Sequence, residues 1–365
     1  MRIAIVVNSS WNIYNFRLNL VKALIARGHE VHTIAPGDEF SSVLLNEGCL
    51  HHSVRMNNGT NPFKDIWLML TLFLIYFKIR PTVILHFTIK PNIYGTLAAS
   101  LLGIPSINNV CGLGTVFLKS DFISSIAMLL YKTSFRFAKK VFFQNQEDLQ
   151  LFLDKKLVSE QLTGLLPGSG IDLQKFAPMA FKRNEKFTFL LISRLITDKG
   201  IIEYINAIRK LNQSDFPARF QLLGALDPLH KRGIKRETVN EWIEAGIVEY
   251  LGTTADVRQF IGQADCIVLP SYREGTPRSL LEAASCSKPI VATDVPGCRQ
   301  VVQDDYNGFL CKIKDPNDLA EKMKRVASLN NEQLKKMGLN GRSKVEKEYS
   351  DLIVIEKYIL AVDGL

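Results

Sequence analysis

The sequence predicts an α/β fold of two Rossmann-like, doubly wound domains that face each other across a central cleft. Three observations support this prediction. The chain has 365 residues, more than a single hydrophobic core usually serves, so two domains of about 170 residues each are expected. Short apolar runs alternate with amphipathic segments, which is typical of parallel sheets with helical crossovers. The alternation pauses near the middle of the chain and then restarts.

The first half contains the strand and helix patterns of one such domain. Apolar runs predict strands at 3–7, 31–35, 82–85, 106–110 and 141–143. Helical spacing between these runs predicts helices at 16–27, 92–102 and 122–138. We therefore expect one parallel sheet with helical crossovers in residues 1–170.

The expected domain boundary lies in residues 166–186, a stretch rich in glycine, proline and basic residues that has no regular period. Beyond it, apolar runs predict strands at 187–192, 220–223, 248–251, 266–269, 289–293 and 308–311. We assign residues 171–348 to the second domain. The last residues, 349–365, predict a C-terminal helix that packs back on the first domain.

Composition fits a globular protein in a reducing compartment. Hydrophobic residues make up 47% of the chain and charged residues 22%, which argues against disorder. The six cysteines form no C-x-x-C pair and lie near no histidine couplet, so neither a zinc site nor a disulfide framework is expected. No secretion signal is apparent at the N-terminus. We therefore expect a cytoplasmic protein.

Most of the net charge of +9 lies in residues 51–140, where ten basic and two acidic residues leave an excess of +8. The same segment contains twelve uncharged residues, 66–77, too few to span a bilayer, which needs about 20. One interpretation is a buried helix of the parallel-sheet domain. Another is an apolar and basic surface that rests on an anionic membrane. Nucleic acid is a weaker alternative, since no recognisable nucleic-acid module accompanies the charge.

The stretch most informative about chemistry is 266–282, CIVLPSYREGTPRSLLE. An apolar strand ends at Pro270, and after a polar turn Thr276 and Pro277 have the pattern of a helix N-cap and a first helical residue. Free amides at a helix start suit a diphosphate or the hydroxyls of a sugar, and Gly275 permits close approach of the backbone. The sequence therefore predicts an anion-binding helix start beside the cleft.

Charged side chains accompany this turn. Glu274 lies in the turn, and Glu282 follows eight residues later in the helix. A second strand leads into a loop at 190–200, LLISRLITDKG, with Arg194 just past the strand and Lys199 at the start of the next helix. A guanidinium and an ammonium there are well placed to neutralise the two phosphates of a leaving nucleotide. Seen in isolation, either pair of charges is more readily interpreted as ordinary surface residues.

Together these motifs resemble the donor half of the retaining GT-B glycosyltransferases of family 4, which share a glutamate, seven residues, glutamate motif. The pairing of SRLITDKG with REGTPRSLLEA carries the resemblance most strongly. LPGSGIDLQKF resembles the interdomain stretch of the family, LLGALD its glycine loop, EYLGTTADV its nucleoside-side loop and VPGCRQVVQDDYNGFL the segment after the motif. The similarity covers essentially the whole chain and is most specific within residues 164–312.

The resemblance implies a role for each charged residue of the donor site. Arg194 and Lys199 would hold the donor diphosphate. Glu282 would bind the ribose hydroxyls, and Glu274 would contact the transferred sugar. Leaving-group stabilisation is the main catalytic demand on such a site, because the sugar carbon develops oxocarbenium character while negative charge collects on the nucleotide.

The resemblance also implies backbone contacts to the donor from Gly224, Gly275, Thr276 and Pro277. Transfer in this family picture is independent of metal, because cationic side chains take the place of a metal ion, and this sequence contains no D-x-D triad. We therefore expect no metal and no cofactor, with a UDP-sugar as substrate.

The first acceptor-side candidates follow the first predicted strand. The run WNIYNFR offers Trp11, Tyr14 and Arg17 as residues of the cleft. An aromatic-rich turn that packs on the sheet is an equally good interpretation. No G-x-G-x-x-G motif occurs in this region, which argues against dinucleotide binding.

Further acceptor-side candidates follow two other predicted strands. His86 and Lys90 lie in HFTIKPN, which resembles a loop common in polysaccharide-forming relatives. Asn109 opens NVCGLGT, where many relatives have a histidine just before the glycine and this chain has Cys111. No acceptor-side catalytic histidine is therefore carried over, and Cys111 is equally compatible with simple packing.

The sequence thus predicts a retaining, metal-independent transferase that moves an N-acetylhexosamine from a UDP-sugar to a lipid-diphosphate-linked oligosaccharide at the inner face of a bacterial membrane. Donor and acceptor follow from the resemblance to relatives that make O-antigen, capsule or lipid-linked glycans. The expected partners include an anionic membrane and exclude nucleic acid. Three alternatives stay open: a GT-B nucleotide-sugar epimerase, a non-catalytic nucleotide-sugar-binding protein, and a Rossmann dehydrogenase, which the missing glycine motif disfavours.

Overall fold

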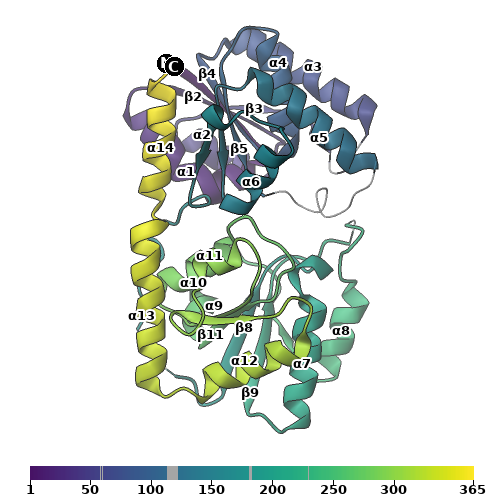
Figure 1. Cartoon of the computed structure of the whole chain (residues 1–365), viewed down its shortest axis with the longest axis vertical. Helices are drawn as coiled ribbons and strands as arrows, with labels where there is room; N and C mark the ends of the chain where they lie inside the picture. Colours follow the sequence, from purple (N-terminus) through teal and green to yellow (C-terminus); the bar gives the residue numbers. More distant parts are fainter. Residues whose placement is uncertain (58, 60, 113–121, 181–182, 229) are drawn as a thin grey trace. The chain divides into compact units, whose positions relative to one another are not determined.

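The chain folds into two compact units in a computed structural model that describes residues 1–57, 59, 61–112, 122–180, 183–228 and 230–365 (Figure 1). Unit 1 contains Met1–Gly170 and Asp351–Leu365. Unit 2 contains Ile171–Ser350. The change from one unit to the other therefore falls in the glycine- and proline-rich stretch where the regular sequence pattern pauses.

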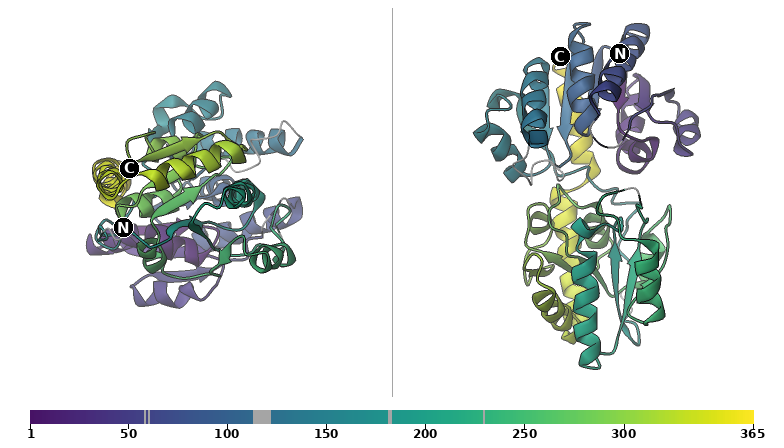
Figure 2. Two further views of the ribbon diagram at one scale, coloured as in Figure 1. Left: turned by 90° about the horizontal axis from the view of Figure 1, so that it is seen from below. Right: turned by 90° about the vertical axis from the view of Figure 1, so that its right-hand side faces the viewer.

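Unit 1 is built on a parallel sheet, which in the described residues has the strand order β3-β2-β1-β4-β5-β6-β7. Helices cover both faces of the sheet (Figure 2). The strands are β1 (Arg2–Val6), β2 (Glu30–Ala35), β3 (Leu50–Ser53), β4 (Val83–Phe87), β5 (Ser106–Val110), β6 (Lys140–Phe143) and β7 (Thr163–Leu165). The helical elements are α1 (Ser10–Ala26), α2 (Phe40–Asn46), α3 (Pro62–Ile79), η1 (Pro91–Gly95), α4 (Thr96–Ser100), α5 (Phe122–Ser134), η3 (Phe135–Phe137), α6 (Gln146–Asp154), η4 (Glu160–Leu162) and α14 (Asp351–Asp363).

Unit 2 repeats this plan, with the parallel strand order β10-β9-β8-β11-β12-β13 in the described residues. The strands are β8 (Phe187–Ile192), β9 (Ala218–Leu223), β10 (Glu249–Tyr250), β11 (Cys266–Leu269), β12 (Ile290–Thr293) and β13 (Gly308–Cys311). The helical elements are η5 (Thr197–Lys199), α7 (Ile201–Gln213), α8 (Arg236–Glu244), α9 (Arg258–Gln263), α10 (Arg278–Ser285), α11 (Cys298–Val301), α12 (Pro316–Ser328) and α13 (Asn331–Glu348).

The central strands form where the sequence is continuously apolar, because both faces of a parallel sheet are covered by helices. In β1, Ile3 and Ile5 pack into one hydrophobic core while Ala4 and Val6 pack into another. Each face of the sheet therefore has its own core, as a doubly wound fold requires.

The helix that closes the chain, α14, belongs to unit 1. The amide of Asn19 on α1 donates to the carboxylate of Asp351 at 2.6 Å, and the side-chain amide of Asn109 in β5 donates to the hydroxyl of Tyr358 at 2.6 Å. Tyr358 is buried and packs on Phe87 and Phe142, with ring centroids 5.6 and 5.2 Å away. The helix thus completes the hydrophobic core on one face of the unit 1 sheet.

Both sheets reverse their strand order at one point. In unit 1 the reversal lies between β1 and β4, and in unit 2 it lies between β8 and β11. In open α/β sheets, ligands bind outside the carboxyl ends of the strands at such a reversal, because the two connecting loops turn away from each other and leave a crevice. The strand order therefore points to one candidate ligand site in each unit.

Candidate functional site

The loops after β8 and β11 meet at the strand reversal of unit 2. The backbone amide of Tyr272 donates to the carbonyl of Asp198 at 2.9 Å and so ties the two loops together. Gly200 has a φ of +71°, and a Cβ at this position would lie 2.0 Å from the carbonyl oxygen of Pro270. Only glycine permits this approach, so the loop contact depends on the residue that follows Lys199.

Lys199 and Glu274 form an ion pair at this junction. The Lys199 ammonium donates to Glu274 Oε1, and the Ser271 hydroxyl donates to the same oxygen at 2.6 Å. The side chain of Glu274 is 11% exposed and that of Lys199 23% exposed. An ammonium has three N–H donors, so Lys199 keeps donors for an anionic ligand while it holds Glu274.

Arg194 lies at the carboxyl end of β8 and turns toward the glycine loop that follows β9. Its guanidinium reaches Asp227 Oδ2 at 3.4 Å, and its side chain is 59% exposed. Gly224 has a φ of +150°, and a Cβ there would lie 1.7 Å from the carbonyl oxygen of Ser193. The glycine loop therefore packs directly on the backbone beside Arg194. The long contact to Asp227 leaves most of the guanidinium donors available to a ligand.

The helix after β11 starts one residue later than the sequence pattern predicts. Pro277 is the N-cap, with an extended backbone (ψ 116°), and α10 begins at Arg278. The expectation that Thr276 is the N-cap is therefore wrong by one residue, because Pro277 takes that position. No side-chain capping hydrogen bond is present at Pro277. The first-turn amides of α10 therefore have no side-chain cap, which suits a ligand that carries acceptor oxygens.

Gly275 is held in place by the loop that follows β12. Gly297 has a φ of +82°, and a Cβ there would lie 2.3 Å from the carbonyl oxygen of Gly275. This approach joins the segment VPGCRQ to the turn that carries Glu274. The backbone of the turn is therefore supported by loops from both neighbouring strands, β8 and β12.

Glu282 is buried on α10 and pairs with Arg278, one turn earlier in the same helix. Arg278 Nε donates to Glu282 Oε1 at 3.1 Å. Burial raises the pKa of Glu282 from the ordinary carboxyl value, and the positive charge of Arg278 opposes this rise. The guanidinium of Arg278 also lies 5.8 Å from the centre of the Phe176 ring. Glu282 is thus a strongly desolvated carboxyl group beside the unit 2 segment that contains Phe176.

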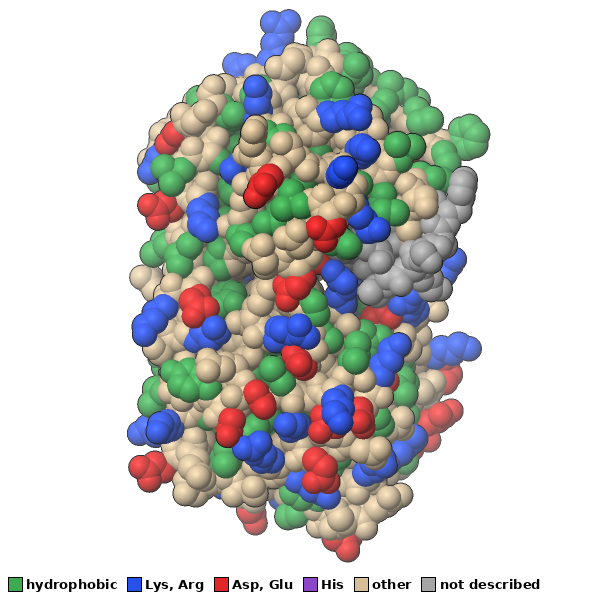
Figure 3. Space-filling view, viewed as in Figure 1, with side chains coloured by type: hydrophobic (Ala, Val, Ile, Leu, Met, Phe, Trp, Pro, Cys, Tyr) green, Lys and Arg blue, Asp and Glu red, His purple; other side chains and the backbone are tan. Residues whose placement is uncertain are grey.

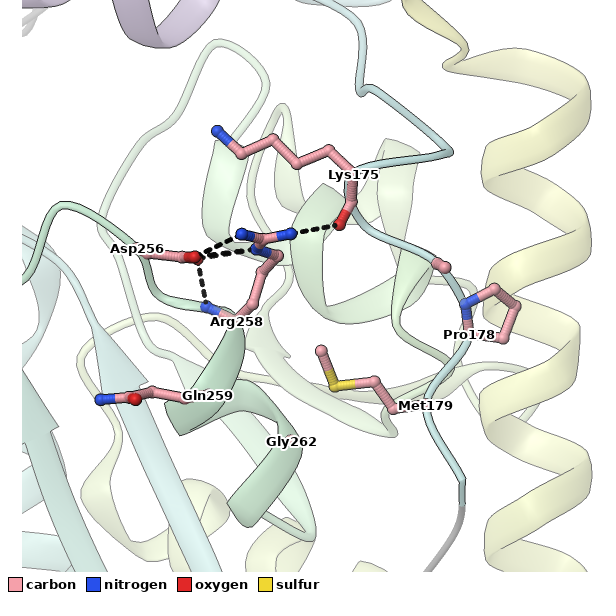
Figure 4. A pocket seen from close by; sticks show the side chains of 8 residues that line it. Lys175, Pro178, Met179, Asp256, Arg258, Gln259 and Gly262 are labelled. Atoms are coloured by element: carbon pink, nitrogen blue, oxygen red, sulfur yellow. Dashed lines mark hydrogen bonds and ion pairs between the residues drawn. The ribbon is translucent and has the colours of Figure 1, made fainter.

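A pocket of about 410 Å³ adjoins this segment (Figure 4). It lies between the stretch 175–179 and the start of α9. Arg258 lines it, donating to Asp256 with Nε 2.9 Å from Oδ1 and to the carbonyl of Lys175 at 3.4 Å. The Arg258 guanidinium lowers the pKa of Asp256 to about 2. Charged groups of both signs and apolar side chains such as Met179 therefore line one small cavity.

In the part of the chain that the structure describes, the four charged donor-site candidates take part in three separate ion pairs. Lys199 contacts Glu274, Arg194 contacts Asp227, and Glu282 contacts Arg278. Arg194 and Lys199 lie on the loop after β8, Glu274 lies in the turn after β11, and Glu282 lies in the second turn of α10.

Sequence reasoning missed several residues of this edge. Arg278 stands four positions before Glu282, a spacing that pairs side chains on a helix and could have identified it. Ser271 stands three positions before Glu274 in the same turn, whereas Asp227 lies on the loop of another strand, and no local signal points to it.

The acceptor-side candidate Arg17 lies at the strand reversal of unit 1. It is buried, and its guanidinium carbon lies 4.0 Å from the centre of the Phe87 ring at the end of β4. It donates to the side chain of Asn12, and its Nη2 lies 3.3 Å from Cys111 Sγ. Its Nε atom is buried and has no hydrogen-bond partner among the described residues. Arg17 is thus a buried cation with no carboxylate partner in that part of the chain.

His86 and Asn109 do not fit direct contact with an acceptor, which corrects the expectation for both. His86 is fully buried, and its imidazole bonds to the Tyr76 hydroxyl and to Asn108 Oδ1, each at 3.0 Å. Burial lowers the pKa of His86 to about 3. Asn109 is 2% exposed and holds Tyr358. Both side chains join core elements together.

The remaining acceptor-side candidates differ in accessibility. Lys90 forms an ion pair of 2.5 Å with the buried Asp65 of α3. Tyr14 packs on Phe40, with ring centroids 4.9 Å apart, and Trp11 is 44% exposed. Residues 113–121, which include the last three residues of the NVCGLGT stretch, lie outside the described residues.

Among the described residues, no group of three or more His, Cys, Asp and Glu side chains has the arrangement of a metal site.

Two families of sequences match this chain. The family described as glycosyl transferases group 1 matches residues 174–344, inside unit 2. The family described as glycosyl transferase 4-like matches residues 2–145, inside unit 1. Together the two matches span most of the chain.

Several curated proteins resemble the chain over most of its length. It is 29% identical to the N,N'-diacetylbacillosaminyl-diphospho-undecaprenol alpha-1,3-N-acetylgalactosaminyltransferase of Campylobacter jejuni, with 100% of this chain and 98% of that protein covered. It is 24% identical to the capsular polysaccharide biosynthesis glycosyltransferase CapM of Staphylococcus aureus, with 92% and 90% covered. It is 22% identical to the UDP-Gal:alpha-D-GlcNAc-diphosphoundecaprenol alpha-1,3-galactosyltransferase of Escherichia coli, with 80% and 78% covered.

Solved structures share the fold. The Anabaena protein HepE in complex with UDP and glucose has a TM-score of 0.82 at 18% identity, and the whole of both chains is covered. The sucrose-phosphate synthase of Thermosynechococcus elongatus has a TM-score of 0.82 at 19% identity, again with full coverage. At such identities the likeness concerns the arrangement of strands and helices.

Proposed function

The chain belongs to the GT-B glycosyltransferases, and from this premise we propose that it transfers an N-acetylhexosamine from a UDP-sugar to a lipid-diphosphate-linked glycan, with retention at the anomeric carbon and without a metal. The acceptor proposal draws on the Campylobacter and Escherichia relatives, whose names specify diphospho-undecaprenol substrates and alpha linkages. Unit 2 is proposed as the donor-binding half and unit 1 as the acceptor-binding half. We place the protein in the cytoplasm, at the inner face of the membrane that holds the acceptor, with no nucleic acid partner.

The ion pair between Lys199 and Glu274 at the strand reversal of unit 2 is the observation that carries this proposal. It sets a cation and a carboxylate side by side, with the uncapped amides of α10 following in the same turn. In the proposed complex, the spare N–H donors of Lys199 and the fork of Arg194 hold the donor diphosphate. Glu274 accepts hydrogen bonds from hydroxyls of the transferred sugar. The cations stabilise the departing UDP because its negative charge grows as the glycosidic bond breaks.

Glu282 is proposed to bind the ribose, and the adjoining pocket to receive part of the nucleoside. The buried carboxyl of Glu282 lies on α10 next to Arg278, and Arg278 lies over Phe176, which follows the pocket residue Lys175. Asp256 of the pocket belongs to the segment EYLGTTADV, which resembles the nucleoside-side loop of the family. The small volume and mixed polarity of the pocket suit one heterocyclic base or its immediate surroundings.

Removal of the Arg194 guanidinium tests the proposal. We expect Arg194→Ala to lower kcat at saturating UDP-sugar. The expected loss of transition-state stabilisation is about 2–4 kcal/mol, as for loss of one contact to a developing anion. Arg209→Ala, on the exposed face of α7, is the matched control and should leave kcat unchanged. A kcat within a few-fold of the wild type for Arg194→Ala would refute the role of this residue.

Incubation without acceptor separates the remaining alternatives. An epimerase would convert the UDP-sugar to its epimer, whereas a transferase requires a lipid-diphosphate-linked acceptor for turnover. A binding protein without catalysis would be stabilised against heat by the UDP-sugar yet form no product with any acceptor. Product formation that depends on the acceptor is the expected result.

A further inference from the structure

The helix α3 of unit 1 has two apolar faces. One face is buried in the core through Leu68, Leu72 and Tyr76. The opposite face is exposed although it is also apolar, with exposed fractions of 46–85%. Its members follow one another at intervals of four, three, four and three residues: Phe63, Trp67, Leu70, Leu74 and Phe77. We call these five residues the outer stripe of α3. The twelve uncharged residues noted in the sequence thus serve both the core and the surface.

Helix geometry makes the outer stripe continuous. Fourteen residues separate its ends, which at about 1.5 Å per residue gives a length of roughly 21 Å. Residues spaced by three and four positions lie on one side of a helix, and Ile66 widens the stripe with 53% exposure. Figure 3 shows hydrophobic side chains gathered over α3, with Lys and Arg side chains beside them. A continuous apolar patch of this kind on a folded protein marks a binding surface.

Contacts at the first turn of α3 hold the helix so that the outer stripe faces the surface. The Asn61 side chain accepts a hydrogen bond from the Lys64 amide at 3.1 Å, and Pro62 occupies the first turn. Asp65 is buried beneath the helix and binds Lys90 at 2.5 Å. Because these contacts fix the helix rotation, Phe63 and Trp67 cannot reach the core of unit 1. Both aromatic rings remain largely exposed, at 85% and 71%.

The exposed charges that α3 and its C-terminal end carry beside the outer stripe are positive. Lys64, Lys78 and Arg80 lie exposed on α3 or at its end, and the Arg80 guanidinium lies 5.8 Å from the centre of the Phe77 ring. Between residues 54 and 111, Asp65 is the only acidic residue of the sequence. Since Asp65 is buried and paired, no carboxylate of this segment faces the surrounding solvent.

We propose that the outer stripe of α3 inserts into the interface of an anionic lipid bilayer, with the helix lying in the plane of the membrane. Apolar side chains on one face of a helix, beside lysine and arginine, fit this location because the rings and aliphatic chains reach the acyl boundary while the cations reach lipid phosphates. Tryptophan is enriched at that depth. None of the helices that the structure describes has the length and apolarity to cross a bilayer, which agrees with surface attachment.

A second copy of this chain is the main competing occupant, because intervals of four and three residues are also those of a coiled-coil seam. Coiled-coil helices usually carry charges of both signs beside the seam, so that opposite charges meet across the interface. On α3 itself, the exposed charges beside the outer stripe are those of Lys64, Lys78 and Arg80. Pairing two such helices would bring like charges together, whereas anionic lipid headgroups complement them.

Vesicle binding by the full chain tests the proposal. We expect co-sedimentation with vesicles that contain phosphatidylglycerol, weaker binding to vesicles of phosphatidylcholine alone, and loss of binding as salt is raised. Trp67→Ser/Leu74→Ser should weaken binding to the anionic vesicles at least tenfold. Leu45→Ser/Leu360→Ser removes two apolar side chains elsewhere in unit 1 that are also more than half exposed, at 52% and 64%, and is the matched control. Equal binding of the two double variants would overturn the proposal.

A fluorescence measurement locates the contact at one residue. Lipids brominated on their acyl chains quench tryptophan that inserts to their depth, and Trp67 should supply the quenched signal. Trp67→Phe keeps the apolar surface, so it should still bind vesicles while the quenching disappears. Persistent quenching in Trp67→Phe would mean that another tryptophan inserts and would refute the assignment.

A dimer in solution that Trp67→Ser/Leu74→Ser dissociates, without any vesicle binding, would establish the second copy as the occupant instead.

The membrane proposal is separable from the proposed activity. None of the stripe residues belongs to the donor site, so transfer to an acceptor with a short, water-soluble lipid chain should be unchanged in Trp67→Ser/Leu74→Ser. Transfer to an acceptor embedded in vesicles should fall with vesicle binding. Vesicle binding without any transfer would refute the proposed activity alone, and transfer without stripe-dependent vesicle binding would refute the membrane surface alone.

Discussion

Arg278 Nε lies 3.1 Å from Glu282 Oε1, and both side chains are largely buried on the first turns of α10. The pair sets a cation beside a desolvated carboxyl group in the helix that follows β11. A buried carboxylate is costly unless a cation compensates it. The proposed ribose contact of Glu282 therefore depends on a neighbour that the family motif does not specify.

Arg278→Ala should destabilise the protein by about 3–5 kcal/mol at neutral pH, because it leaves Glu282 buried without its cation. Burial raises the pKa of Glu282 above its ordinary value of 4.5, which applies in the unfolded chain. At a pH above 4.5, ionisation of the Glu282 carboxyl therefore opposes folding. The destabilisation should therefore shrink as the pH falls toward that value. Thermal unfolding of the variant and wild type at several pH values measures this. Arg278→Ala/Glu282→Gln serves as control and should be more stable than Arg278→Ala at neutral pH; equal stability would contradict the charge argument.

Gly200→Ala should separate the two loops of the donor site. A Cβ at Gly200 would meet the Pro270 carbonyl at 2.0 Å, in addition to the strain of a φ of +71°. Gly246→Ala isolates the strain alone, because Gly246 has a φ of +64° and nothing within 4 Å of its added Cβ. Strain of this kind costs about 1–2 kcal/mol. We expect Gly200→Ala to lower the melting temperature clearly more than Gly246→Ala and to reduce transfer as well; similar effects of the two would contradict the contact.

The sequence identified the central strands because parallel strands buried on both faces are continuously apolar. The ranges predicted for Ser106–Val110, Phe187–Ile192 and Cys266–Leu269 match the observed central strands. Two outer strands were missed, Leu50–Ser53 and Thr163–Leu165, because each is short and only partly buried. A strand at the edge of a sheet lacks the apolar run that reveals a central one.

Some residues of the candidate sites could be predicted from the sequence and others could not, depending on whether their partners follow from the strand order. Lys199 and Glu274 stand at strand exits, and parallel strands bring their exits to one edge, so their proximity follows from topology. The burial of His86 depends on Tyr76 of α3 and Asn108 of β5. These partners meet only after α3 packs on the sheet, and no local pattern around His86 contains that information.

His86 should make stability depend on pH. Burial lowers its pKa to about 3 from the ordinary value of 6.5, so below pH 6.5 the unfolded chain binds a proton that the folded chain rejects. Stability should therefore fall as the pH drops from 6.5 toward 3, with a contribution of up to about 1.4 kcal/mol per pH unit from this group. His86→Gln lacks the contribution. The difference in melting temperature between wild type and variant should change steadily over this range, and a constant difference would show that His86 titrates normally.

Lys199→Ala should lower kcat by about two to three orders of magnitude, as expected for a cation that faces charge developing on the leaving group. The variant also leaves Glu274, whose side chain is 11% exposed, without its ion pair, and displacement of this carboxylate would lower kcat as well.

Glu274→Gln separates the two effects, because it removes that charge while Lys199 stays available to the diphosphate. Calorimetric titration with UDP, which has no sugar, should show weaker binding for Lys199→Ala and nearly unchanged binding for Glu274→Gln. Lys210→Ala, at the exposed far end of α7, controls for the lost positive charge and should match the wild type. If Lys199→Ala instead raised KM with kcat unchanged, the ammonium would bind ground state and transition state equally, and its proposed part in leaving-group departure would be wrong.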